Sequence, residues 1–458
     1  MNATAIDSAR EAETPGELVR VEFLGGLPVF ARFGNCGSHP LFAHDAPPGY
    51  TFAHTGKAEA PPAPPTVLRA IGALFLTFWM LAATARRFGL LRTVRTLVRF
   101  AGFVREQWRA TGSLRSSVTF AHSRNFESQV QAPRGESLAF LTSVPYTVGQ
   151  APWVIEIEDP TTLFFPFVEN GRTSNLDIRK LPCFEQVKAL LEADHCRGIV
   201  THMRGTAELL PVLFQSERIA RKVTFGPLGV PLPSRFQKHE SDGPIDLLFT
   251  NSWHQGANNF FLRGGLDVLE AFDVLRRRFP NVRLTLRSAL PDLSEHHSRI
   301  IRDSWVRVIP DFVSADAMRE LLTESHVYLL PAARIHVVSL LQAMANGLAV
   351  VASDGWGFDE YVEHGRTGLL VPGRDRRTSW IDRANGMLRE DYSPMREADP
   401  RVVEGIVESV SLLVEQREVR ARLGSAARDA VRERFNLSQW NATLARAFDR
   451  ARATKTNG

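Results

Sequence analysis

The chain has 458 residues, of which 44% are hydrophobic and 23% are charged, and its formal net charge is +5 at pH 7. This balance excludes a disordered, collagen-like or disulfide-scaffold protein, and the length predicts two or three domains, of which we expect two. Because the charges nearly cancel, the composition gives no reason to expect nucleic acid as a partner.

The N-terminal part of the sequence is predicted to hold one strand and a long loop. Residues 1–20 lack the apolar core of a secretory signal, which favours a cytoplasmic protein. A short strand is predicted over 20–24, and Gly25 and Gly26 follow it directly. The Pro-, Gly- and His-rich stretch 34–65 is predicted as a loop.

A basic amphipathic helix is predicted within the region 66–110. The uncharged run 70–85 is shorter than the roughly 20 residues that a membrane-spanning helix needs. Further on, Arg92, Arg95 and Arg99 lie on one face of the helix, opposite an apolar face. The apolar positions are Leu90, Leu91, Val94, Leu97, Val98 and Val104. Such a helix suits the anionic inner face of a membrane, and the alternative is a helix packed on its own domain.

Strand-like and helical segments alternate between residues 118 and 236, which predicts a parallel sheet with helices on its faces. One expected strand ends in His122. Another, within 152–159, carries Glu156, Glu158 and Asp159 near its end. Carboxylates at a cleft edge bind hydroxyl groups or act as a general base, and the alternative is a set of solvated acids. For His122 the alternative is a packed structural histidine.

The polar segment 235–245 interrupts this pattern and is predicted to be a linker between two domains. Residues 1–234 would then form an N-terminal Rossmann-like domain, and residues 246–458 a C-terminal one with terminal helices. The predicted fold class is therefore α/β, with two parallel sheets facing each other across a cleft. Ligands of such sheets bind at the carboxyl ends of the strands.

The most informative segment is 328–373, whose pattern predicts two helix N-termini at one sheet edge. Such N-termini favour an anion, for example a diphosphate, without any metal. Gly355 and Gly357 would let the backbone approach a ligand closely, and Glu360 would accept hydrogen bonds from two sugar hydroxyls. His336 and Ser339 lie at the start of the first of these helices. They are candidates for contact with the diphosphate, and the alternative is that they cap the helix.

This segment resembles the donor-binding half of the family-4 retaining glycosyltransferases, which have the GT-B fold. The matching positions are Ala343, Met344, Ala345, Gly347, Gly357, Glu360 and 367–371. Segments 225–236 and 262–272 are similar to the family segments on either side of the linker, and Gly25 and Gly26 resemble its N-terminal glycine loop, which contacts acceptor or phosphate. The resemblance covers about 110–450. It implies a nucleotide-diphosphate sugar as donor and a glycan or lipid-linked acceptor, as in polysaccharide biosynthesis.

The chain departs from the family pattern at four donor-binding positions. Arg334 and Gln342 stand where the family has the two glutamates of a Glu-x7-Glu pair. Gln342 keeps one donor and one acceptor for the nucleotide ribose, whereas Arg334 has donors only and suits a ligand with a carboxylate or phosphate. Asn258 and Arg263 stand where the family has its phosphate-binding Arg and Lys. The alternative for Arg263 is a solvated surface residue.

The resemblance implies transfer with retention of configuration and without a cofactor or metal. No Asp-x-Asp motif is present, and Cys36, Cys183 and Cys196 lie outside any metal-ligand spacing. The leaving diphosphate would accept the acceptor proton, so catalysis by Glu360, with His122 and Glu158, would consist of positioning and charge stabilisation. Two alternatives stay open: a catalytically inactive glycosyltransferase-like binding protein, and a sugar-nucleotide epimerase of similar fold.

Overall fold

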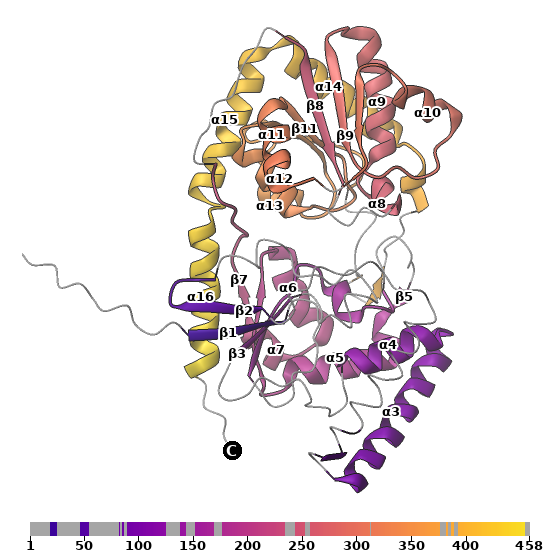
Figure 1. Ribbon diagram of the computed structural model, residues 1–458, viewed down its shortest axis with the longest axis vertical. Helices are drawn as coiled ribbons and strands as arrows, with labels where there is room; N and C mark the ends of the chain where they lie inside the picture. The colour runs from indigo at the N-terminus through magenta and orange to yellow at the C-terminus, as the bar shows by residue number, and fades with distance from the viewer. Residues whose placement is uncertain are drawn as a thin grey trace, which may run out of the picture.

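A computed structural model gives the structure of the protein. It describes residues 19–24, 46–54, 82, 85–86, 89–124, 138–142, 152–168, 176–233, 243–251, 257–311, 313–375, 382, 386–388 and 393–453. These residues build two α/β domains, one above the other in Figure 1. Each domain has a six-stranded sheet whose neighbouring strands all run parallel. The predicted pair of parallel-sheet domains is confirmed.

The N-terminal sheet has the strand order β2-β1-β3-β4-β6-β7. Its strands are β1 (Val19–Leu24), β2 (Tyr50–His54), β3 (Leu138–Thr142), β4 (Trp153–Glu156), β6 (Cys196–Thr201) and β7 (Val223–Phe225). The described helices on this domain are α3 (Leu90–Thr111), α4 (Leu114–Arg124), α5 (Pro182–Glu192), α6 (Arg204–Phe214) and α7 (Glu217–Lys222), with 3-10 turns η1 (Pro160–Phe164) and η2 (Ile178–Lys180). The strand β2 lies inside the stretch 34–65, so the prediction of a continuous loop there is wrong.

The prediction of a strand that ends in His122 is also wrong, because this segment forms the helix α4. Ser113 begins the helix, since its Oγ accepts a hydrogen bond from the N–H of Ser116 (3.2 Å). Among the described side chains of α4, those of Ser117, Phe120 and Ala121 are buried. These positions recur at helical spacing. In the sequence, the short run of β-branched and aromatic residues there favoured a strand instead.

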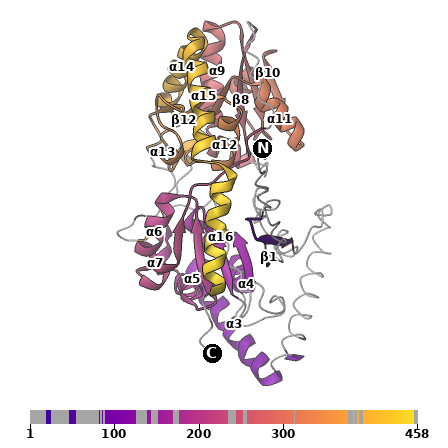
Figure 2. The same ribbon diagram turned by 90° about the vertical axis from the view of Figure 1, so that its left-hand side faces the viewer.

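The helix α3 projects at the end of the N-terminal domain that is far from the C-terminal domain (Figures 1 and 2). Thr93, Val104 and Gln107 are buried. The other predicted apolar positions are exposed, among them Leu91 at 69% and Val98 at 68%. The predicted helix is confirmed. It packs against α4 and α5 of its own domain, as the alternative held, but five of the six predicted apolar positions are exposed. No described helix is both long and apolar enough to cross a bilayer.

The C-terminal sheet has the strand order β10-β9-β8-β11-β12-β13. Its strands are β8 (Ile245–Thr250), β9 (Val282–Arg287), β10 (Val306–Ile309), β11 (Val327–Leu330), β12 (Ala349–Ser353) and β13 (Leu369–Val371). Its helices are α8 (Ala257–Leu262), α9 (Gly265–Arg278), α10 (Glu295–Ile301), α11 (Ala315–Glu324), α12 (Val337–Ala345), α13 (Phe358–Tyr361), α14 (Pro400–Glu415) and α15 (Arg417–Glu433). The strand order is that of a dinucleotide-binding Rossmann sheet, and it reverses between β8 and β11.

Segments late in the chain return to the N-terminal domain. The helix α16 (Leu437–Ala453) packs on the N-terminal sheet, where the Phe448 ring meets those of Tyr50 and Phe140 at 5.2 Å each. Strand β14 (Met387–Leu388) pairs with β5 (Leu176–Asp177). Figure 2 shows α15 and α16 following one another along both domains. The assignment of all residues after 246 to the C-terminal domain therefore needs revision, because the apolar face of α16 covers the other sheet.

The predicted linker falls largely outside the described residues, which resume at 243. A single apolar cluster includes residues of both domains, among them Phe140, Met203, Ile335 and Trp440. Two further clusters each lie within one domain. The domains thus meet through packed apolar side chains as well as through polar groups.

Candidate active site

The reversal point of the C-terminal sheet places buried polar groups at the carboxyl ends of β8 and β11. Thr250 Oγ1 and Tyr328 Oη lie 2.7 Å apart, and both side chains are buried. Burial raises the pKa of Tyr328, against the opposing effects of the Thr250 bond and of the positive charge of Arg263. Arg263 follows α8 and is only 2% exposed. The alternative of a solvated surface arginine is therefore wrong, and Arg263 brings a buried positive charge to this reversal point.

The helix α12 begins at the same sheet edge, directly after β11. His336 is its N-cap residue but makes no capping bond through its side chain, and the first turn contains no acidic residue. Ser339, in that turn, shares a side-chain hydrogen bond with Tyr328. Neither residue caps α12 among the described contacts. The first N–H groups of α12, together with the helix dipole, therefore favour an anion at this point.

Glu360 of α13 reaches across to the N-terminal domain. Its Oε2 accepts a hydrogen bond from the N–H of Arg204 (2.6 Å), and its Oε1 accepts one from the N–H of Gly205 (2.9 Å). These are the first two residues of α6, so a carboxylate occupies that helix N-terminus. Burial raises the pKa of Glu360 more than the two N–H bonds lower it.

The next residue, Tyr361, makes a second pair of bonds between the domains. Its hydroxyl donates to the carbonyl oxygen of His202 (2.7 Å) and accepts from the N–H of Leu228 (3.0 Å). The Tyr361 side chain is 2% exposed. Two consecutive residues of α13 thus hold backbone groups of the N-terminal domain, and sequence reasoning selected only the first of them.

Arg334 forms an ion pair with Asp159 across the same interface. The Arg334 side chain is 15% exposed and that of Asp159 is 4% exposed. Asp159 also accepts a hydrogen bond from the N–H of Thr161 (2.8 Å), which caps η1. Arg334 was expected to face an anionic group of the ligand. In the structure the carboxylate that it meets belongs to the protein itself.

Three ionisable groups of the N-terminal domain gather beside this pair. His202 Nδ1 lies 2.9 Å from Oε1 of Glu156, and both side chains are buried. Burial alone would lower the pKa of His202, but the Glu156 bond and the charges of Glu158 and Glu360 raise it overall. Glu158 is partly buried, and burial raises its pKa against the effects of His202 and Arg334.

Gly355 and Gly357, which were predicted to face a ligand, allow close contacts within the protein itself. A Cβ on Gly355 would lie 2.4 Å from the carbonyl oxygen of Ala332 and 2.5 Å from that of Ala333. Gly357 has φ of +85°, a conformation that favours glycine, and a Cβ there would lie 2.5 Å from Met203. These glycines therefore allow the loop before α13 to lie against the loop before α12 and against the N-terminal domain.

The remaining predicted site residues are less closely defined. Gln342 lies in α12 and is partly buried. Asn258 lies in α8, but its side chain is outside the described part of the chain. Gly25 and Gly26 are also outside it. His122 lies in α4, a helix that packs against α3, and not at a strand end of the sheet.

Sequence reasoning missed His202, although the signal was visible. A buried strand with a histidine directly after it was the pattern assigned to His122, and β6 followed by His202 satisfies it. Tyr361 gave no comparable signal, because its role depends on carbonyl and N–H groups that only the tertiary structure brings near it.

One comparison with known proteins matches part of the C-terminal domain. Residues 262–390 match the family model described as Glycosyl transferases group 1. No curated protein sequence matches the chain.

Three solved structures illustrate the likeness of the chain to known proteins. HepE of Anabaena, in complex with UDP and glucose, has a TM-score of 0.46 at 12% identity, over 68% of this chain and 77% of that chain. The pneumococcal O-GlcNAc transferase GtfA, in complex with UDP and GlcNAc, has a TM-score of 0.48 at 12% identity, over 74% of this chain and 60% of that chain. Sucrose-phosphate synthase from Thermosynechococcus elongatus has a TM-score of 0.45 at 15% identity, over 68% of this chain and 73% of that chain.

The observed topology agrees with the architecture that the resemblance implied. Both sheets present their carboxyl ends, with Glu360, Arg334 and Asp159, to the interface between the domains. The chain has the GT-B fold, and residues 262–390 of its C-terminal domain match the family model of the glycosyl transferases group 1.

Proposed function

We propose that the protein is a glycosyltransferase that moves a sugar from a nucleotide-diphosphate donor to a glycan or lipid-linked acceptor. The observation that carries this proposal is the group 1 match over residues 262–390, which contain the uncapped N-terminus of α12, Arg263 and Glu360. These are the groups that a donor needs: positive potential for a diphosphate and a carboxylate for sugar hydroxyls.

The donor diphosphate would lie at the N-terminus of α12, near Arg263. The dipole of a nine-residue helix and a buried guanidinium both stabilise negative charge there. Gln342, further along the same helix, would contact the ribose through its amide. Asn258 and His336 remain donor-binding candidates by their place at this sheet edge.

The sugar would lie beside Glu360. Because this carboxylate holds the N–H groups of Arg204 and Gly205, sugar hydroxyls would have to take over its oxygens when the donor enters. Donor binding is thus coupled to the contact between α13 and α6. Binding energy from the nucleotide would offset the loss of these bonds.

Transfer would retain the configuration of the donor carbon and need no metal. As the bond from that carbon to the diphosphate oxygen breaks, the acceptor oxygen bonds to the same face, and its proton passes to the leaving diphosphate. Positive charge at α12 and Arg263 stabilises the developing negative charge. Glu158, two residues after β4, would bind acceptor hydroxyls.

The test is incubation of the full chain with UDP-, GDP- and dTDP-sugars, with and without EDTA. Release of nucleoside diphosphate, by transfer or slow hydrolysis, supports an enzyme, and activity that persists in EDTA supports metal independence. NMR of the product then reports the anomeric configuration. Donor binding without product would favour the inactive binding protein, and an isomerised nucleotide sugar would favour the epimerase.

We further propose that α3 docks the enzyme on the anionic inner face of a membrane that holds the acceptor. Its exposed apolar side chains are those of Leu90, Leu91, Val94, Leu97, Val98 and Trp108. The arginines Arg95, Arg99, Arg105 and Arg109 are exposed on the same helix. Apolar groups among acyl chains, with arginines at the phosphates, are the pattern of an interfacial helix. This location, like the cytoplasmic one, is a proposal.

Vesicle co-sedimentation tests the docking surface. We expect binding to vesicles with phosphatidylglycerol and weak binding to pure phosphatidylcholine, with loss of binding in a Leu91→Asp, Val98→Asp double variant. Val274→Asp, at an exposed valine of the C-terminal domain, is the matched control. Equal sedimentation of the double variant and the wild type would contradict membrane docking by α3.

A further inference from the structure

A cluster of metal-binding side chains lies on the C-terminal domain, apart from the site at the domain interface. It consists of Glu270 on α9 and of His296 and His297 on α10. Figure 1 shows α9 and α10 on the side of this domain opposite to α15. Neither helix contributes to the contacts of Glu360, Tyr361 or Arg334 described above.

The three side chains converge on one point. His296 Nε2 lies 3.1 Å and His297 Nε2 lies 2.9 Å from Oε1 of Glu270, and one ligand atom from each residue lies within 4.8 Å of the others. Tetrahedral Zn²⁺ with bonds of about 2.1 Å separates its ligand atoms by roughly 3.4 Å. Small side-chain rotations would therefore open the cluster enough to admit an ion.

A neighbouring residue orients the more buried histidine. Ser294 Oγ lies 2.8 Å from Nδ1 of His297, so the hydrogen on Nδ1 can be donated to Ser294 while Nε2 stays free to bind a metal. An outer hydrogen bond of this kind is common at histidine ligands, because it fixes the tautomer and the ring. The His297 side chain is 16% exposed, that of Glu270 31% and that of His296 45%.

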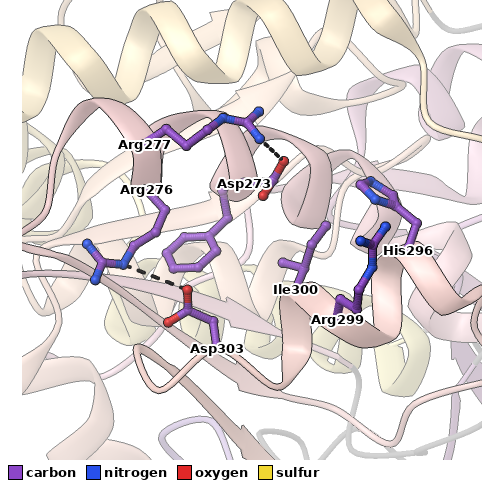
Figure 3. Close-up of a pocket in the computed structure, with 8 residues that line it drawn as sticks. Asp273, Arg276, Arg277, His296, Arg299, Ile300 and Asp303 are labelled. Carbon is purple, nitrogen blue, oxygen red and sulfur yellow. Dashed lines mark ion pairs between the residues drawn. The ribbon is translucent and has the colours of Figure 1, made fainter.

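Solvent can reach the cluster from an adjoining cavity. A cavity of about 260 Å³ lies beside it, and His296 belongs to both (Figure 3). In this cavity Arg277 pairs with Asp273 at 2.7 Å. The carboxylate of Asp273 thus already has a cation as partner, and Glu270 is the acid that lies within reach of both histidines.

We propose that Glu270, His296 and His297 bind one divalent transition-metal ion, such as Zn²⁺, with water completing its coordination. Two imidazoles and one carboxylate are ligands that Zn²⁺ favours, whereas Mg²⁺ and Ca²⁺ prefer oxygen ligands alone. The ion joins α9 to α10 and takes no part in sugar transfer. The site is therefore expected to affect local stability and not turnover.

Calorimetric titration of tag-free, EDTA-treated full chain with ZnCl₂ tests this site. We expect one Zn²⁺ per chain, and a loss of affinity of more than about 100-fold in His297→Ala and in Glu270→Gln, since loss even of an outer-shell group costs 10–100-fold. Glu295→Gln is the matched control, because this neighbouring carboxylate pairs with Arg302. Glu270→Gln keeps the shape of the side chain, so it remains informative if His297→Ala fails to fold.

A second readout separates the metal site from a simple hydrogen-bonded cluster. Co²⁺ bound to two imidazoles should give a visible absorption spectrum in the wild type that is absent in Glu270→Gln. An absence of stoichiometric Zn²⁺ binding, or equal binding by wild type and both variants, would overturn the proposal.

Discussion

The N-termini of α6 and α12 lie at the same interface between the domains, but their surroundings differ. Met203, just before α6, and Ile335, two residues before α12, both lie close to Gly357. At α6, the Glu360 carboxylate accepts the first two N–H groups. At α12, the described residues provide neither a capping side chain nor an acid in the first turn.

Two equivalent helix ends thus acquire different tasks. Both ends carry the same partial positive charge, so each attracts an anion. The Glu360 carboxylate accepts hydrogen bonds from the first two N–H groups of α6 and thereby joins the domains. The end of α12 is left for an anion that the described residues do not supply, and on our proposal that anion is the donor diphosphate.

Replacing the carboxylate at α6 should have the largest effect on activity. Glu360→Gln removes a charged acceptor worth up to about 3 kcal/mol, so we expect donor turnover to fall by roughly 100-fold. Nucleoside diphosphate release measures it. Asp359→Asn, at the exposed neighbouring acid, should stay near wild type. A less stable variant with unchanged turnover would mean that Glu360 serves only as a domain contact.

The ion pair beside this carboxylate offers the next test. Either Arg334→Met or Asp159→Asn alone leaves one ion without its partner, and we expect the free energy of unfolding to fall by about 3 kcal/mol in each. The double variant should lose less than the sum of both. Urea unfolding of all four proteins measures the coupling, and additive losses would show that the pair contributes nothing by itself.

Placing a carboxylate at α12 would make the two helix ends alike. Ser339→Asp adds a negative charge in the first turn, where we expect it to compete with the diphosphate and raise the donor KM by about tenfold. The helix dipole should keep the variant stable. Ser339→Asn adds similar bulk without charge and is the control, and an equal KM in all three proteins would exclude a diphosphate at this helix end.

The smallest expected effect concerns pH. Burial raises the pKa of Glu158, so the folded protein binds this proton more tightly than the unfolded chain. Its contribution to stability is therefore full below the ordinary glutamate pKa and is lost as pH rises through the raised folded value. Glu158→Gln should gain stability relative to wild type across that window. Urea unfolding at several pH values measures this, and a constant difference would contradict it.

The sequence predicted the C-terminal sheet more fully than the contacts between the domains. Its strands alternate with helices and their apolar runs are unambiguous, so β8, β11 and β12 and the helix α12 were all expected. The pairing of Arg334 with Asp159 was not expected, because the two residues are 175 positions apart in the sequence. In the N-terminal part, the segment ending in His122 has residues that suit a strand, but helical burial decided its structure.

The return of α16 to the N-terminal sheet has a consequence for synthesis in the cell. Domains generally fold in order as they leave the ribosome, yet this sheet receives Trp440 and Phe448 only after the other domain has been made. The domain translated first is therefore completed last, and until then the sheet surface that α16 covers is a natural target for chaperones.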